Sequence, residues 1–120
     1  MNTMIGFGGK EFSDRWLRMG LMEQMGNVGS EYERGLSWRR KGKTDFALRA
    51  FDRTLALLDL TIEDVRWKGS RRREIARARE LVCNVIVNPP VQEEDSLGLA
   101  KYFFQFAVAA RNQKAEPQNP

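Results

Sequence analysis

The sequence has 120 residues, of which 42% are hydrophobic and 30% are charged, and its formal net charge is +4. This is enough for one domain with its own core, but no apolar run approaches the roughly 20 residues of a membrane-spanning helix. The chain has no histidine, and Cys83 is its only cysteine, which excludes an internal disulfide, most metal sites and the common histidine-activated nucleophiles. The first ten residues lack the pattern of a secretory signal. We therefore expect a cytoplasmic protein with no membrane segment, and nothing indicates a metal, a cofactor or a catalytic residue.

The longest predicted helix spans residues 13–41 and follows an N-terminal arm, residues 1–12, which we expect to be flexible. Ser13 is a suitable N-cap, and Gly42 follows the basic end of the segment, where glycine commonly ends a helix. A 3.6-residue period places one apolar stripe along this helix, formed by Leu17, Leu21, Met25, Val28, Tyr32 and Leu36. Glycines inside a helix cost stability and indicate close approach of another element, and this segment contains Gly20, Gly26, Gly29 and Gly35. The alternative is a helix that is kinked or interrupted near residues 26–29.

Three further helices are predicted. The second begins at Thr44 and continues to about residue 59, antiparallel to the first because only a few residues connect them. Thr61 and Asp64 then resemble a capping box for a short extra helical turn. The third helix, residues 70–87, has an apolar stripe formed by Ile75, Ala78, Leu81, Val82, Val85 and Ile86. The fourth starts near residue 95, with a core face formed by Leu97, Ala100, Phe103, Phe104, Ala107 and Val108.

These patterns predict an all-α protein. Residues 82–87 are rich in β-branched side chains, but their helical spacing and the absence of a partner strand favour a helix. Every proline lies at or after position 89, where Pro89 and Pro90 stop the third helix. We expect residues 13–111 to form a single domain, a four-helix up-and-down bundle, followed by a disordered tail at residues 112–120.

The side of the first helix opposite the apolar stripe is the first candidate site. Two large aromatic residues lie there with polar residues between them, and the set comprises Trp16, Glu23, Asn27, Glu31, Arg34 and Trp38. Residues three or four apart on a helix are close enough to pair. We therefore expect Glu23 or Glu31 to pair with Arg34 or with an arginine of the second helix, with Asn27 in the same network. Such a network would fix the packing of this helix against a neighbour or a second subunit, and the alternative is a ligand pocket.

A basic segment before and within the third helix is the second candidate site. It contains Arg66, Lys68, Arg71, Arg72, Arg73, Arg77 and Arg79. A run of this kind can contact several phosphates of a nucleic acid, although Trp67 is the only aromatic residue in the segment for stacking on bases. Ion pairs with acidic residues of the same chain, or a solvated face, explain the segment about as well.

Several stretches of the sequence resemble an uncharacterised family of small prokaryotic all-helical proteins. They are GLMEQMGNVGSE at residues 20–31 with Arg34 and Trp38, AFDRTLALLDLT at 50–61, REIARARE at 73–80 and KYFFQFA at 101–107. The resemblance implies a compact helical domain and no activity, and the loop at residues 88–95 departs from the family pattern. A looser similarity to HEPN-type bundles, some of which are ribonucleases, implies a non-catalytic relative, because the histidine of their motif is missing here.

The most specific function that these observations predict is a non-enzymatic helical module that self-associates, as a homodimer for example, or binds another protein. Its motivation is the first helix, which presents two interaction faces. The alternative, from a different class, is association with nucleic acid through residues 66–79. The thiol of Cys83 lacks an activating base in the sequence pattern, so we expect it to be inert.

Overall fold

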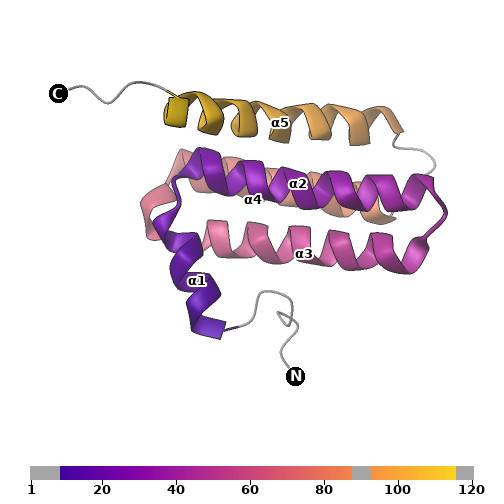
Figure 1. The fold of residues 1–120 in the computed structure, drawn as a ribbon, viewed down its shortest axis with the longest axis horizontal. Helices are drawn as coiled ribbons and strands as arrows, with labels where there is room; N and C mark the ends of the chain where they lie inside the picture. Colours follow the sequence, from indigo (N-terminus) through magenta and orange to yellow (C-terminus); the bar gives the residue numbers. More distant parts are fainter. Residues whose placement is uncertain (1–8, 88–92, 116–120) are drawn as a thin grey trace.

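The computed structural model describes residues 9–87 and 93–115, and their regular structure is all helical (Figure 1). The α-helices are α1 (Gly9–Arg18), α2 (Leu21–Arg40), α3 (Thr44–Ile62), α4 (Ser70–Val87) and α5 (Glu93–Ala115). A short 3-10 helix, η2 (Val65–Trp67), lies between α3 and α4. Neither of the two described ranges contains a strand, so the all-α prediction is confirmed.

Helix α2 is the centre of the packing. Its most extensive contacts are with α3 and α5, while α4 contacts α3 and, less extensively, α5. The four helices α2 to α5 lie lengthwise beside one another, and α1 crosses them at one end (Figure 1). The predicted stripe of α2 forms the middle of the core, where Met25, Val28 and Tyr32 are almost completely buried. Phe51 and Phe103 pack against the Tyr32 ring from α3 and α5, with ring centroids 6.1 and 5.6 Å away.

The prediction of a single helix over residues 13–41 is wrong, because the helix is interrupted at Met19 and Gly20. Helix α1 ends at Arg18, and Gly20 adopts an extended conformation (φ −76°, ψ 169°) as the N-cap of α2. The change of direction buries the Trp16 ring in the core and leaves Leu17 46% exposed, the reverse of what one continuous helix requires. The alternative break at residues 26–29 is also wrong, since α2 continues through them.

Three of the four glycines predicted to allow close approach of another element do so, whereas a Cβ atom at Gly20 would meet nothing within 4 Å. A Cβ atom at Gly26 would lie 3.0 Å from the Cα of Ala107, and one at Gly29 would lie 2.5 Å from the Cβ of Phe103. At Gly35 the same atom would lie 2.5 Å from the Phe51 ring. Helix α5 therefore packs onto the backbone of α2 at Gly26 and Gly29, and Phe51 of α3 packs onto it at Gly35. A larger residue at any of these positions would require neighbouring atoms to move.

The connection between α2 and α3 is closed by a column of two stacked rings with a cation at each end. Trp38 stacks on Phe46 with centroids 4.8 Å apart, the Lys41 ammonium lies 5.2 Å from the Trp38 centroid, and the Arg49 guanidinium lies 5.4 Å from that of Phe46. Gly42, with φ +74°, provides the left-handed turn expected after the helix. The two helices are thereby fastened as antiparallel neighbours.

The ends of the other helices differ from the prediction by a few residues. Helix α3 continues to Ile62, and the turn after it is capped by Asp64 alone, which accepts a hydrogen bond from the Arg66 amide. The capping role assigned to Thr61 is wrong, because its hydroxyl donates to the Leu57 carbonyl inside α3. Helix α4 spans the predicted residues, including 82–87.

The domain boundaries also move at both ends. Helix α1 takes in residues 9–12 of the expected flexible arm, and α5 takes in residues 112–115 of the expected disordered tail. The rest of the arm and of the tail, and the prolines at 89 and 90, lie outside the described residues. Among the helices of the described ranges, none is both long and apolar enough to cross a membrane.

The crossing of α2 and α5 gives a direct test of the packing. Gly29→Ala should lower the free energy of unfolding by about 1–3 kcal/mol, because overpacking against Phe103 outweighs the better helix propensity of alanine. Gly98→Ala in α5 is the matched control, since a Cβ there meets no atom within 4 Å. It should be neutral or stabilise by up to about 1 kcal/mol in urea denaturation. A Gly29→Ala variant as stable as the control would contradict the close approach.

Candidate functional site

The predicted ion pairing on α2 is confirmed at Glu31. Its carboxylate accepts hydrogen bonds from Arg34 Nη1 at 2.9 Å and from Arg53 Nε of α3 at 3.1 Å. The Glu31 side chain is only 15% exposed, whereas that of Arg34 is 55% exposed. The pair with Arg53 therefore joins α2 to α3, and the pair with Arg34 lies at the surface.

The other members of the predicted network lie elsewhere. Asn27 is exposed and donates to the sulfur of Met19 at 3.4 Å, so its assignment to the Glu31 network is wrong. Glu23 pairs with Lys114 near the end of α5 at 3.5 Å. Glu23 and Asn27 line a small hollow between α2 and α5, and neither Glu31 nor Arg34 is part of its lining.

The two tryptophans do not flank one interaction face. Trp16 belongs to α1 and is 2% exposed in the core, where Phe12 stacks on it. Trp38 is half-buried in the column at the α2–α3 connection. The prediction of a two-faced helix flanked by both rings is wrong, because it assumed that residues 16 and 38 lie on one helix.

Glu31 pairs with both Arg34 and Arg53. Removing Glu31 should therefore lower the free energy of unfolding more than removing Arg34 does. Arg34→Ala should lower the free energy of unfolding by less than about 1 kcal/mol, as for exposed ion pairs. Glu31→Ala should cost about 1–2 kcal/mol, because Arg53 also loses its partner in a more buried place. Urea denaturation of the two variants measures the difference, and an Arg34→Ala effect as large as that of Glu31→Ala would contradict this order.

Part of the predicted phosphate-contacting segment is used inside the protein. Arg66 donates to both carboxylate oxygens of Asp64, at 3.0 and 2.7 Å, and to the carbonyl of Met19 at 2.7 Å. Arg79 donates to Asp59 at 2.7 Å, and Arg71 lies 3.6 Å from Glu74. These pairs favour the intramolecular explanation for three of the seven cations.

The remaining four basic residues differ in exposure. Arg72 is half-buried with Nη2 3.5 Å from the Asp64 carbonyl, and its buried Nε has no partner among the described residues. Lys68, Arg73 and Arg77 are exposed, and within residues 9–87 and 93–115 no ion pair involves them. Arg73 and Arg77 lie about one turn apart on α4, and Lys68 precedes this helix, so three cations of the segment remain for an external partner.

A buried hydrogen-bond network, which the sequence analysis did not identify, joins the two chain reversals at one end of the molecule. The side chain of Gln24 is completely buried in α2. Its Nε2 donates to the Trp16 carbonyl at 2.8 Å and to Asp64 Oδ2 at 3.2 Å, and its Oε1 accepts from Trp67 Nε1 at 2.8 Å. Trp16 Nε1 in turn donates to Thr61 Oγ1 at 3.1 Å. We call these residues, with Arg66, the Gln24 network.

The Gln24 network makes stability depend on the ionisation of Asp64. The side-chain hydrogen bonds from Arg66 hold the pKa of this carboxyl below its ordinary value, although burial opposes the shift. Because the pKa is lower in the folded chain, the ionised form stabilises the fold above the ordinary value of 3.8. This stabilisation is lost as the pH falls through the lowered pKa.

Asp64→Asn should therefore cost about 2–3 kcal/mol at neutral pH, since hydrogen bonds to a buried charged group are lost. The difference from the parent chain should begin to shrink as the pH falls below the ordinary value of 3.8, where the unfolded chain takes up the proton, and should shrink further as the pH falls through the lowered pKa of the folded chain. Asp52→Asn, at an exposed position of α3, is the matched control and should change stability by less than about 0.5 kcal/mol. Urea denaturation between neutral pH and about pH 3 measures the free energy of unfolding of both variants. A difference between Asp64→Asn and the parent chain that does not depend on pH would contradict the role of the charge.

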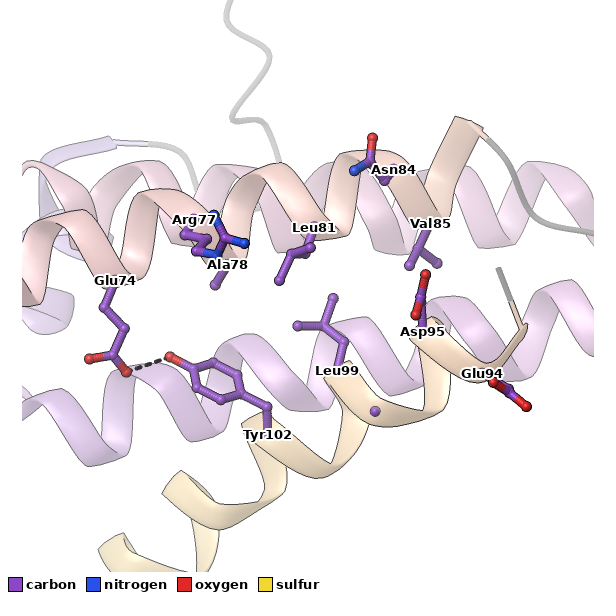
Figure 2. A pocket seen from close by; sticks show the side chains of 11 residues that line it. Glu74, Arg77, Ala78, Leu81, Asn84, Val85, Glu94, Asp95, Leu99 and Tyr102 are labelled. Carbon is purple, nitrogen blue, oxygen red and sulfur yellow. Dashed lines mark hydrogen bonds between the residues drawn. The ribbon is translucent and has the colours of Figure 1, made fainter. Parts of the chain in front are cut away.

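A hollow lies between α4 and α5, and we call it the α4/α5 groove (Figure 2). Its volume is about 530 Å³, and it is lined by Glu74, Arg77, Ala78, Leu81, Asn84, Val85, Glu94, Asp95, Gly98, Leu99 and Tyr102. Figure 2 shows Leu81 of α4 and Leu99 of α5 pointing toward each other across its middle. The groove exists because α4 and α5 contact each other less than either α2 and α5 or α3 and α4 do.

Polar groups lie at the two ends of the groove. At one end the Tyr102 hydroxyl donates to Glu74 at 2.7 Å, and Arg77 lies one turn further along α4. Burial, together with this hydrogen bond, raises the pKa of the Tyr102 hydroxyl, so it remains a donor at neutral pH. At the other end, Glu94 and Asp95 are exposed at the start of α5.

The sequence pattern misplaced two residues of this region. Leu81 was assigned to the buried stripe of α4 but is 41% exposed over the groove. Tyr102, which was not assigned to the core face of the fourth predicted helix, is half-buried and bonded to Glu74. The apolar stripe of α4 is wider than the surface that one neighbouring helix covers. Such a wide stripe is the only sign of this kind of groove in the sequence.

An apolar middle with charges at its ends can hold side chains of a polypeptide more readily than it can carry out acid–base chemistry. Within the described parts of the chain, no three His, Cys, Asp or Glu side chains gather as a metal site. Comparison with protein-family models, with curated proteins and with solved structures finds no match for this chain. The resemblance noted from the sequence therefore stays an expectation.

Proposed function

We propose that this chain is a non-enzymatic binding module and that the α4/α5 groove receives a helix of another polypeptide chain. In this proposal, α2 to α5 act as a four-helix up-and-down bundle whose last pair is incompletely closed. The observation that carries the proposal is the half-exposed Leu81 over an apolar floor, in a hollow of about 530 Å³.

The shape and chemistry of the groove support a helical ligand. It follows the length of α4 and α5 over about three turns of α4, from Glu74 to Val85, and apolar residues line its middle. An amphipathic helix lays its apolar face in such a groove and places polar side chains at the rim. The acidic pair Glu94 and Asp95 favours a ligand with a basic side chain at that end.

Nucleic acid is the second candidate ligand, and it is supported by the exposed Lys68, Arg73 and Arg77. Contact with phosphates through all seven basic residues would have to compete with the pairs of Arg66, Arg71 and Arg79. Binding through three cations would be weak and steeply dependent on salt.

Backbone amide NMR spectra of the ¹⁵N-labelled chain test the proposal. The probe is a synthetic Leu/Lys amphipathic helix of about 18 residues, five turns long. We expect its addition, or an increase in the concentration of the chain itself, to shift resonances of α4 and α5 that line the groove. Leu81→Asp should abolish these shifts, because it places a charge over the apolar floor.

Leu48→Asp is the matched control, since Leu48 is 46% exposed on α3 and is not part of the groove lining. It should leave the shifts unchanged. Groove resonances that respond neither to the probe peptide nor to protein concentration would show that the proposed function is wrong. Shifts confined to Lys68, Arg73 and Arg77 on adding an RNA oligonucleotide would favour the second candidate.

A further inference from the structure

We propose that the occupant of the α4/α5 groove is α4 of a second copy of this chain, in a dimer with two-fold symmetry. This inference rests on the proposed function and names its ligand. In a two-fold interface the same surface serves both copies, so the surface must be complementary to itself. The α4/α5 groove meets that condition in shape and in charge.

The shape condition concerns the middle of the groove. Leu81 stands 41% exposed there with Leu99 opposite it (Figure 2), and the small residues Ala78 and Gly98 also line the groove. A Cβ atom at Gly98 would meet nothing within 4 Å, so space remains at this point. With the symmetry axis near Leu81, each copy would insert this leucine beside the small residues of the other. A projecting leucine next to a hollow is the arrangement by which packed helices interlock.

The charge condition concerns the two ends. Helices α4 and α5 are antiparallel along the groove, because Tyr102 meets Glu74 early in α4 while Glu94 and Asp95 lie near Val85 late in α4. The first end is basic, since Arg77 has no acidic partner among the described residues, and Glu74 is engaged by Arg71 and by the Tyr102 hydroxyl. The second end is acidic.

A two-fold rotation about the middle places the basic end of one copy over the acidic end of the other. Arg77 of each copy then faces Glu94 and Asp95 of the second copy, and this contact occurs twice. Charge complementarity between the ends thus selects an antiparallel pair of α4 helices. Helix α4 itself supplies the ligand that the groove requires: an apolar side chain with a basic residue one turn away.

The test is a charge exchange, followed by analytical ultracentrifugation. The parent chain should form a dimer, with twice the 13.9 kDa mass of one chain, as its concentration is raised to about 200 μM. A dissociation constant below this concentration is in the range of weak interfaces. Arg77→Glu should weaken the dimer by roughly tenfold or more, because both contacts become repulsive. The double variant Glu94→Lys with Asp95→Lys should weaken it similarly for the same reason.

An equimolar mixture of these two variants is the decisive sample. In the mixed dimer one contact is native, and the other is attractive with its charges exchanged, so affinity should return to within about threefold of the parent value. The matched control is Arg40→Glu, the same charge change at an exposed position outside the groove, and it should leave the dimer unchanged. Circular dichroism confirms that each variant is folded, and recovery in the mixture itself requires folded partners.

The possible outcomes separate this inference from the proposed function. A dimer that is insensitive to the groove variants, or a mixture that does not recover, would overturn the two-fold groove dimer. A parent chain that stays monomeric while the probe peptide shifts groove resonances would also overturn it, but would leave the proposed function standing. A monomer whose groove ignores the peptide would overturn both.

Discussion

The buried amide of Gln24 is the interaction on which the ends of the helices depend. Its donor and acceptor groups reach the carbonyl that ends α1, the carboxylate that caps η2 and the indole of Trp67. A buried amide that lost these partners would be costly, so all three segments are held in one arrangement. The break between α1 and α2 and the turn between α3 and α4 are consequently fixed against each other, although some 40 residues of chain separate them.

Helical periodicity was sufficient for the all-helical class, for the places of α3, α4 and α5 and for the centre of the core. The stripe of α2, the glycine contacts with α5 and the extent of α4 follow from local sequence, because each depends on spacing along one helix. The break at Gly20 did not follow. Residues 13–41 satisfy a helical pattern throughout. Contacts with residues far along the chain, such as Trp16 with Thr61 and the Met19 carbonyl with Arg66, favour two helices over one. Periodicity carries no information about such a distant partner.

The candidate site was less predictable than the fold for a related reason. The pairing of Glu31 was foreseen because its partner Arg34 is three residues away, whereas the groove depends on how closely two separate helices approach. A leucine has the same place in a helical pattern whether its neighbour covers it fully or partly, so Leu81 could not be recognised as exposed. Likewise, the sequence shows a dense basic segment, but Asp59 and Asp64 reduce the charge that it presents.

The column of Lys41, Trp38, Phe46 and Arg49 has a consequence for the order in which the chain folds. Its two rings are eight residues apart, whereas the hydrogen bond from Gln24 to Asp64 closes a loop of 40. The entropy lost on closing a loop grows with its length, so the column can form while the rest of the chain is still unfolded. The α2–α3 hairpin then offers an apolar surface on which the other helices can pack. We expect its local contacts to form before the contacts between distant parts of the chain.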